Sequence, residues 1–299
     1  MPWTPLLLFA GYLFFFFASV ALMLGWQKRT RKRRLPFGED LKLLRAPGET
    51  QLKLVRQLDE NGREWLMFAS FAPAVVAAVL LVTTSRLPRD FQVAGVAVTL
   101  LAFTGAFYLA ARWLAGKFRE QSNRYLGYFG ERLVAEQLEP LKTEGWRIFH
   151  DVPFANNGTP FNIDHIAVGP GGVFAIETKT RRKGGARPGF VDHKVFFDGR
   201  DLVWPWGEDS HGLEQAERNA LSLAGFIKAE TGQHVHVTPV LTLPGWFVEM
   251  KPARESRPAR VTNPKGLPKF LSGGSPVLNS EQITAIAARL EVRCRDVEY

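Results

Sequence analysis

Three long apolar runs dominate the first 115 residues of the chain. Residues 5–26 carry no charged side chain, and two further runs follow at residues 65–84 and 91–115. A helix needs about 20 mainly apolar residues to cross the hydrocarbon core of a bilayer. The pattern therefore predicts three transmembrane helices, the second and third forming an antiparallel hairpin around the short loop at residues 85–90. The alternative for this hairpin is a buried helical pair inside a soluble protein.

The positive charges beside these runs predict how the helices are oriented. A basic segment at residues 28–34 follows the first run, whereas a cleaved signal peptide carries its positive charges before the apolar run. Lys117 and Arg119 follow the third run, and Arg112 near its end can extend its charged tip to the interface. Because Lys and Arg collect on the cytoplasmic side, we expect a multi-pass protein of the inner (plasma) membrane. Its N-terminus would lie outside, and the chain after residue 116 would be cytoplasmic.

Residues 27–64 link the first two apolar runs and mix charged residues with leucines. Their spacing predicts one or two short amphipathic helices at the inner membrane surface, where the basic residues meet anionic lipid. We expect no catalytic or metal-binding residues in this linker.

Beyond residue 116 the pattern becomes that of a soluble α/β domain. Apolar positions three and four apart predict helices, and short β-branched or aromatic runs between turn residues predict strands. The predicted helices are residues 123–141, 213–230 and 280–290. The predicted strands are residues 145–154, 161–168, 173–179, 194–199 and 234–243, with a further short strand at residues 259–262. This order describes a mixed central sheet with flanking helices. The predicted boundaries are residues 1–26, 27–64 and 65–116 for the membrane part, 117–243 for the domain, and 244–299 for an extension that completes it.

One predicted hairpin gathers charged side chains on a single face. If the turn at residues 169–172 closes without a bulge, Val168 lies opposite Val173, and counting back places Asp164 opposite Glu177. Residues that face each other across an antiparallel pair have Cβ atoms about 4.5–5.5 Å apart, so the two carboxylates would repel each other unless a cation lay between them. Lys179 points to the same face. The arrangement favours a hard divalent metal, which binds oxygen ligands, beside an ammonium group that holds an anion or activates a water.

The opposite face of this hairpin is predicted to be buried. Its apolar residues are Ile163, Ala167, Phe174 and Ile176. His165 points away from Asp164 and is expected to pack in the interior.

Composition narrows the partners and excludes two kinds of site. The single cysteine among 299 residues, Cys294, excludes an intramolecular disulfide and a cysteine-based zinc site. A net charge of +9 and a pI near 9.8 favour a polyanionic partner, either nucleic acid or anionic lipid. A basic loop at residues 180–187 begins directly after Lys179, where it either grips a phosphate backbone or is simply solvated. The basic side chains that would grip nucleic acid are Arg181, Arg182, Lys183 and Arg187.

Two other pairs of side chains carry competing interpretations. His234 and His236 alternate on a predicted strand, but without a nearby acidic partner they indicate a strand face rather than a metal site. Trp204 and Trp206 could stack on a nucleic-acid base, although packing within the protein is the simpler interpretation.

The order of these motifs resembles that of a known family. The residues that carry the resemblance are Gly130 and Glu131 in a helix, Ile163 to His165 in one strand, Ile176 to Lys179 in the next, and Gln215 with Asn219 in a following helix. They are similar to the nuclease-related domain, NERD, which is similar in turn to the restriction-endonuclease-like superfamily with its PD-(D/E)XK site. The resemblance covers roughly residues 124–243. The proline that the superfamily places before its first aspartate is absent, since Asn162 and Ile163 stand there.

The resemblance implies a restriction-endonuclease-like fold and a role for each motif residue. Asp164 and Glu177 would bind Mg²⁺, or alternatively Mn²⁺, with the main-chain carbonyl of Thr178 as a further ligand. Lys179 would position the attacking water or the scissile phosphate. Glu131 would assist at the metal site, and Gln215 would orient Lys179 or a phosphate.

The sequence as a whole favours a membrane-anchored, Mg²⁺-dependent nuclease that cuts DNA on the cytoplasmic side, with three helices in the lipid bilayer. The alternative is a non-catalytic membrane adaptor that binds nucleic acid or a protein partner through a nuclease-like domain. A transport or signalling unit is disfavoured, because no apolar run carries a charged residue at its middle. The oligomeric state is not predicted.

Overall fold

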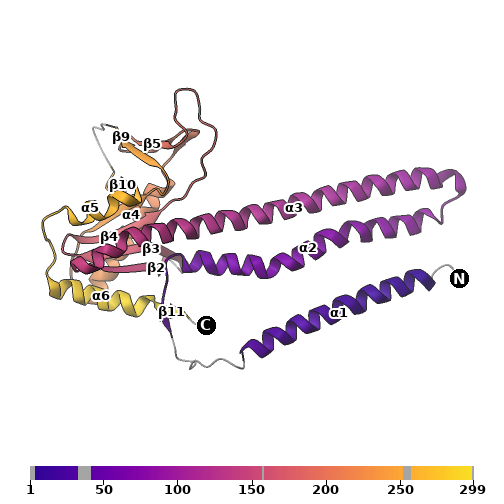
Figure 1. The fold of residues 1–299 in the computed structure, drawn as a ribbon, viewed down its shortest axis with the longest axis horizontal. Coiled ribbons are helices and arrows are strands. Elements are labelled where there is room, and N and C mark those ends of the chain that lie inside the picture. Colours follow the sequence, from indigo (N-terminus) through magenta and orange to yellow (C-terminus); the bar gives the residue numbers. More distant parts are fainter. Residues whose placement is uncertain (1–3, 33–41, 157, 252–256, 298–299) are drawn as a thin grey trace. The chain divides into compact units, whose positions relative to one another are not determined.

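The computed structural model describes residues 4–32, 42–156, 158–251 and 257–297 (Figure 1). The chain divides into two compact units. The first contains helix α1 (Thr4–Lys32), and the second is the segment Leu44–Val297. The second unit therefore holds both the remaining apolar helices and the α/β part.

Helix α1 coincides with the first predicted transmembrane run. It is 29 residues long and continues into the basic segment as far as Lys32. Its described apolar stretch, Phe14–Trp26, is shorter than the about 20 residues that a bilayer crossing needs. Two helices among the described residues, not the three predicted, are long and apolar enough to cross a membrane.

Those two helices are α2 (Glu49–Thr84) and α3 (Arg89–Leu138), which lie side by side as an antiparallel hairpin (Figure 1). At about 1.5 Å per residue, their 36 and 50 residues give lengths of about 54 and 75 Å. Large apolar side chains along both helices are exposed, including Phe68, Val93 and Leu101. Because soluble monomers rarely expose so continuous an apolar surface, the hairpin is compatible with a membrane environment.

The prediction of separate short helices in the linker is wrong for its described part. From Glu49 onward these residues are the first part of α2, which continues through Gly62 into the apolar run. A glycine inside a helix costs only about 1 kcal/mol relative to alanine, too little to end one that packs along its length. Helix α3 also continues through the predicted boundary at residue 116, because no proline interrupts it. Residues 33–41 of the linker lie outside the described residues.

Five strands form a central mixed sheet in the order β10-β8-β4-β3-β2. Its strands are β2 (Arg147–Asn156), β3 (Thr159–Gly169), β4 (Gly172–Thr178), β8 (Val237–Thr242) and β10 (Arg260–Thr262). Strands β2, β3 and β4 pair antiparallel, whereas β4, β8 and β10 pair parallel. The predicted mixed sheet is therefore confirmed.

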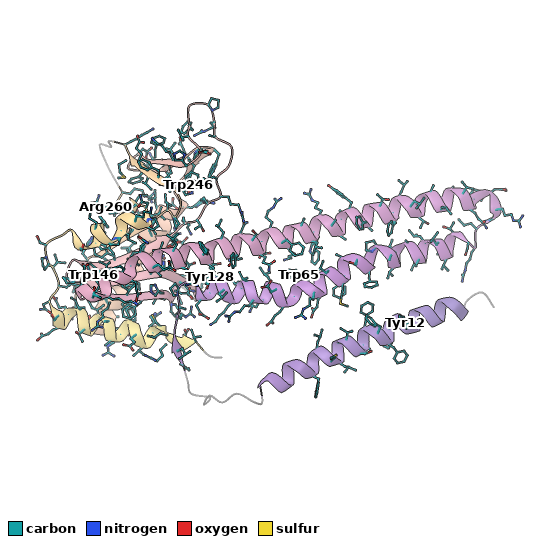
Figure 2. All side chains as sticks on the ribbon, in the orientation of Figure 1. Tyr12, Trp65, Tyr128, Trp146, Trp246 and Arg260 are labelled. Atoms are coloured by element: carbon teal, nitrogen blue, oxygen red, sulfur yellow. The ribbon has the colours of Figure 1, made fainter. Side chains whose placement is uncertain are left out.

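Helices cover both faces of this sheet (Figure 1). The end of α3 and the short α5 (Leu267–Ser272) pack on one face, and α4 (His211–Thr231) and α6 (Ser280–Cys294) pack on the other. Trp146 (Figure 2) belongs to the core between the sheet and helices α3 and α5. A Cβ added at Gly169 would overlap the Trp146 ring, so this contact requires glycine. The remaining short elements are β1 (Leu43–Leu44), η1 (Glu139–Glu144), η2 (Pro264–Gly266) and β11 (Arg295–Val297).

The register of the central hairpin is as predicted, with Val168 opposite Val173. Its burial pattern differs at one position, because Ile163 packs with α4 and α6 rather than with Ala167 on the other face. The register of β2 on β3 passes from His150 opposite His165 to Val152 opposite Ile163 and skips Asp151, whose φ of 48° is left-handed. A left-handed residue interrupts the strict alternation of a strand, and this interruption lies level with Asp164.

A second sheet, which the sequence analysis does not predict, follows the central hairpin. Its order is β7-β6-β5-β9, and its strands are β5 (Lys194–Phe197), β6 (Leu202–Trp204), β7 (Gly207–Asp209) and β9 (Phe247–Met250). Trp204 and Trp246 lie in its core, and Trp206 stacks on Trp204 with ring centroids 5.6 Å apart. Trp204 therefore serves packing, as the simpler interpretation predicts.

His150 and His165 form a pair across β2 and β3, with their Nδ1 atoms 2.8 Å apart; His165 is buried and His150 is half-buried. Burial, with help from Lys142, lowers the pKa of His150 to about 4. Burial and the neighbouring His150 lower the pKa of His165 well below its usual value. A histidine whose pKa falls on folding stabilises the folded state above its unfolded pKa of about 6.5, and this contribution is lost as the pH falls from there toward the folded pKa.

We expect His150→Gln to flatten the acid dependence of stability. Between pH 6.5 and 4.5 the variant should lose less free energy of unfolding than the wild type, by on the order of 2 kcal/mol, because one titrating group is gone. Denaturant titrations of the full chain in detergent measure this difference. His236→Gln is the control, since His236 is exposed. Parallel curves for His150→Gln and the wild type would contradict the prediction.

Candidate active site

Asp164 and Glu177 lie on the two strands of the central hairpin. One position beyond the pair of His165 and Ile176, the same register brings Asp164 level with Glu177, as the sequence predicts. The Asp164 Oδ2 accepts a hydrogen bond of 2.7 Å from the main-chain N–H of Thr178. Asp164 keeps some exposure, whereas Glu177 is only 2% exposed.

Lys179 joins the two strands to helix α4. Its Nζ lies 2.7 Å from the Glu177 Oε1 and donates to the Gln215 Oε1 at 2.9 Å. The other Glu177 oxygen, Oε2, accepts from the Asn219 Nδ2 at 2.9 Å. The structure therefore brings Glu177, Lys179 and Gln215 together, and it adds Asn219 as a second partner of the glutamate.

Local packing explains why these side chains meet. The Lys179 main-chain N–H donates to the Thr242 carbonyl at the end of β8 and so fixes the chain where it leaves β4. Gln215 and Asn219 are four residues apart, which places them on the same face of α4. At Gly212 an added Cβ would lie 3.2 Å from the Lys179 Cγ, so the absence of a side chain lets the first turn of α4 approach the lysine.

Glu131 approaches from α3, beyond the apolar part of that helix, and is 5% exposed. The neighbouring Gly130 allows the close approach, because a Cβ there would run into the Thr180 side chain. Burial raises the pKa of Glu131 to about 8, with further contributions from the charges of Asp151 and Glu177. The charge of Lys179 acts in the opposite direction.

The carboxyl groups of the site raise one another's pKa. Burial raises the pKa of Asp164 well above its usual value, and the charges of Glu177 and Glu131 add to this. Burial also raises the pKa of Glu177, although the Lys179 ammonium opposes it. For Lys179, burial alone would lower the pKa, but Glu177 outweighs it and the pKa is raised. Lys179 is therefore charged at neutral pH, among carboxyls whose mutual repulsion a further cation would relieve.

The oxygen atoms at the site are of the kind that binds a hard cation, but few residues supply them. Within residues 4–32, 42–156, 158–251 and 257–297, no three or more Asp, Glu, His or Cys side chains are grouped as a metal site. The fit rests on the two carboxyl groups of Asp164 and Glu177 and on the main-chain carbonyl of Thr178. Carboxylate and carbonyl oxygens are the ligands that Mg²⁺ and Mn²⁺ take in proteins.

The four basic residues predicted to hold nucleic acid differ in how they are used. The Arg182 guanidinium binds Ser122 on α3, with Nη2 2.7 Å from Oγ. Arg187 donates to the Trp204 and Pro205 carbonyls, and Arg181 lies 3.5 Å from Asp209. Lys183 is exposed and has no hydrogen bond or ion pair with any residue that the structure describes. Arg182 and Arg187 thus hold the loop in place, and Lys183 and Arg181 are the most available charges.

Three residues of this region escape the sequence analysis as site residues. Asn219 is one of the residues that carry the family resemblance, but the resemblance gives it no role at the site. Its spacing of four from Gln215 places both side chains on one face of the helix, and this signal could have identified it. Asp151 carries a buried carboxyl beside the site, and Thr50 binds it from the start of α2. No local pattern identifies these last two, because Thr50 and Asp151 are 101 residues apart in the chain.

Comparison with known proteins finds a family match for part of the chain. Residues 126–244 match the family model of the nuclease-related domain, NERD. The matched segment runs from the last part of α3 to just beyond β8 and contains the site side chains Glu131, Asp164, Glu177, Lys179 and Gln215. Searches of curated proteins and of solved structures find no match. The resemblance that the motifs indicate over residues 124–243 is therefore confirmed.

Proposed function

We propose that this protein is a membrane-anchored nuclease that hydrolyses phosphodiester bonds of DNA with Mg²⁺ or Mn²⁺. The observation that carries the proposal is the convergence of Glu177, Lys179 and Gln215, with Asp164 on the adjacent strand, inside the segment that matches the nuclease-related domain. Phosphodiester cleavage requires an activated water and stabilisation of negative charge at phosphorus. Acidic and cationic groups held side by side are suited to both.

The metal would be held by Asp164, Glu177 and the main-chain carbonyl of Thr178. When bound, Mg²⁺ would neutralise charge on the scissile phosphate and lower the pKa of a coordinated water. Asn219 fixes one oxygen of Glu177, so that the carboxylate cannot rotate freely. Glu131 brings a further carboxyl group from α3, whose raised pKa a bound cation would lower.

Lys179 would bind the phosphate or the attacking water. An ammonium group has three N–H donors, and Glu177 and Gln215 use two of those on Lys179. Its side chain is 30% exposed, so the remaining donor can reach a ligand that enters from solvent. Gln215 and Glu177 fix the position of the ammonium before the substrate arrives, which is the arrangement that stabilises developing charge most effectively.

The proposed membrane arrangement has three helices. The apolar parts of α2 and α3 would cross the bilayer as a hairpin. Helix α1 would provide a further crossing, because residues 5–26 carry no charged side chain. Basic residues at 28–34 and at Arg112, Lys117 and Arg119 support a cytoplasmic position for the nuclease-related segment and an N-terminus outside.

The test is nicking of a supercoiled plasmid by the full chain in lipid nanodiscs. We expect open-circular DNA to form with Mg²⁺ or Mn²⁺ and none to form in EDTA. Parallel reactions with single-stranded DNA and with RNA identify the substrate class. Binding of DNA without cleavage under every metal condition would contradict the nuclease proposal.

That contrary outcome would match a second candidate, a non-catalytic membrane adaptor that binds nucleic acid. One observation favours it, namely that both oxygens of Glu177 already have protein partners, Lys179 and Asn219. A metal would have to share or displace these contacts. Retention of DNA binding by Glu177→Ala, together with an inactive wild type, would identify the adaptor.

We expect the charges of the basic loop to set the salt dependence of DNA binding. Replacing Arg181 and Lys183 together by alanine should reduce the slope of log affinity against log salt by about 2, because about one counterion is released for each phosphate contact. Fluorescence anisotropy in EDTA measures binding without cleavage. The charge-matched control replaces the exposed Lys228 and Lys265 by alanine. An unchanged slope in the Arg181 and Lys183 variant would exclude this loop from the interface.

A further inference from the structure

The turn that precedes α2 packs directly on the end of α3. Gly48 has a left-handed φ of 70°, and a Cβ at this position would lie 2.7 Å from the Tyr128 ring and 3.3 Å from the Tyr128 main chain. Tyr128 lies beside the start of α2 (Figure 2) and is three residues before Glu131 on α3. The close approach therefore requires glycine at position 48, and it brings the start of α2 next to the site.

Asp151 attaches the first turn of α2 to strand β2. Its Oδ2 accepts from the Thr50 main-chain N–H at 2.9 Å and from the Thr50 hydroxyl at 2.7 Å. The Arg45 Nη1 donates to the same oxygen at 2.9 Å, and the Asn162 Nδ2 donates to Oδ1 at 2.9 Å. Asp151 is 3% exposed, so these four bonds compensate a buried carboxyl group with a left-handed backbone.

Arg45 extends this network to the last strand of the chain. Its Nε and Nη2 contact the two carboxylate oxygens of Asp296 at 2.6 and 2.8 Å. A bidentate contact of this kind fixes a guanidinium group in both position and plane. Arg45 is therefore held from one side by Asp296 and itself holds Asp151 from the other.

The network reaches the acidic residues of the site along two routes. Asn162, two residues before Asp164 on β3, donates to the Thr50 hydroxyl at 2.6 Å as well as to Asp151. Gly48, at the start of α2, packs on Tyr128, which lies one turn before Glu131 on α3. The first N–H groups of a helix lack partners within the helix and favour negative groups. In this protein the Asp151 carboxyl group, from β2, accepts from the Thr50 N–H in the first turn of α2.

We propose that Arg45 and Thr50 are positioning residues for the nuclease site, which hold Asp164 and Glu131 in place through Asp151, Asn162 and the start of α2. The inference rests on the proposed function and deepens it. The matched segment, residues 126–244, would then hold the acidic groups but lack two of the residues that position them. The first turn of α2, which continues into the apolar hairpin, would be a working part of the site.

The test compares Thr50→Ala with Thr50→Ser in the full chain in nanodiscs. The alanine variant keeps the main-chain bond to Asp151 and loses the hydroxyl bonds to Asp151, Asn162 and Arg45, whereas serine keeps the hydroxyl. Mn²⁺ affinity is measured by calorimetry without nucleic acid, and kcat and KM are measured on plasmid. We expect Thr50→Ala to weaken Mn²⁺ binding about tenfold and to lower kcat by a similar factor with little change in KM, because residues behind metal ligands have effects of this size. Thr50→Ser should restore both quantities.

The control is Thr83→Ala, which makes the same change on α2 where the hydroxyl contacts only the Leu80 carbonyl among the described residues. A second variant, Asp296→Asn, loosens Arg45 without touching Asp151, and it provides the answer should Thr50→Ala not fold. It should weaken Mn²⁺ binding in the same direction by a smaller factor.

The outcomes separate the inference from the proposed function. If the wild type binds Mn²⁺ and cleaves DNA, and both variants keep wild-type Mn²⁺ affinity and kcat while only their melting temperatures fall, the network is structural and the inference is wrong. If the wild type neither binds Mn²⁺ nor cleaves, and Glu177→Ala is indistinguishable from it, the proposed function fails and the inference fails with it.

Discussion

Glu177→Gln is expected to abolish plasmid cleavage, with a loss of at least about a thousandfold in kcat/KM, and to weaken Mn²⁺ binding strongly. The substitution keeps the shape of the side chain and removes the negative charge that a metal and Lys179 both need. Glu177 is buried and contacts Lys179 and Asn219, so no other carboxylate can take its position without moving a strand. Gel-based nicking and calorimetry with Mn²⁺ measure the two losses.

The same variant should not lose thermal stability without metal. Burial raises the pKa of Glu177, which means that holding this carboxylate ionised in the folded protein costs free energy. Glutamine removes that cost, as is common when an active-site residue is neutralised. The control is Glu136→Gln, since Glu136 is exposed on α3 and makes a long, solvent-exposed ion pair of 3.7 Å with Arg132. Cleavage by Glu177→Gln at the wild-type rate would remove Glu177 from the mechanism, and a large fall in melting temperature would assign it a structural role.

Lys179→Met is expected to separate turnover from metal binding. Without the ammonium group, kcat should fall by about a hundredfold to a thousandfold, the range for a preorganised charge that stabilises the transition state. Mn²⁺ affinity should stay the same or increase, because Lys179 no longer competes for the Glu177 Oε1 that it now contacts at 2.7 Å. Single-turnover cleavage and calorimetry on the same preparation give both quantities.

The matched control for this lysine is Lys228→Met. Lys228 lies 13 residues after Gln215 on α4, about 20 Å along the helix, and is exposed. It should behave as wild type in both measurements. Loss of metal binding together with turnover in Lys179→Met would show that the lysine supports the metal site itself and would contradict its assignment to the phosphate or the water.

The central hairpin could be predicted from the sequence because its information is local. Alternating apolar residues and a glycine-rich turn fix which strand positions face each other, and one counted register places Asp164 level with Glu177. Gln215 and Asn219 lie on one face of a helix whose periodicity is also local. The position of the acidic groups and the lysine therefore follows from neighbours within about 15 residues.

The contacts that complete the site could not be predicted in this way. Arg45 meets Asp151 across 106 residues and Asp296 across 251, and no periodicity relates such distant positions. The left-handed backbone of Asp151 is also invisible in the sequence, since glycine is the residue that usually signals it. The sequence pattern places Ile163 on the wrong face because it assumes strict alternation along β3, whereas Ile163 packs with Ile166 and Val168.

Helix lengths were underestimated for a related reason. Composition changes at residues 64 and 116, and a change in composition indicates a change in environment rather than the end of a helix. Helices α2 and α3 continue through both positions because a single glycine, Gly62 or Gly116, costs too little to end a packed helix and no proline stands at either place. The apolar run of α1 does not reach the length of a crossing within the residues whose side chains the structure describes, so two candidate spans stand where three were predicted.

Helix α3 is a single proline-free rod that carries an apolar stretch at one end and Glu131 near the other, whereas its partner α2 contains Pro73. A continuous helix transmits rotation along its length, and a shift by one residue corresponds to a rotation of about 100° and a rise of about 1.5 Å. Rotation and sliding of the apolar part by one residue would therefore move the Glu131 carboxyl group away from its neighbours. A truncated protein that begins within α3 therefore changes the helix that positions Glu131. For the same reason, bilayer thickness is a variable to control in assays of the proposed nuclease.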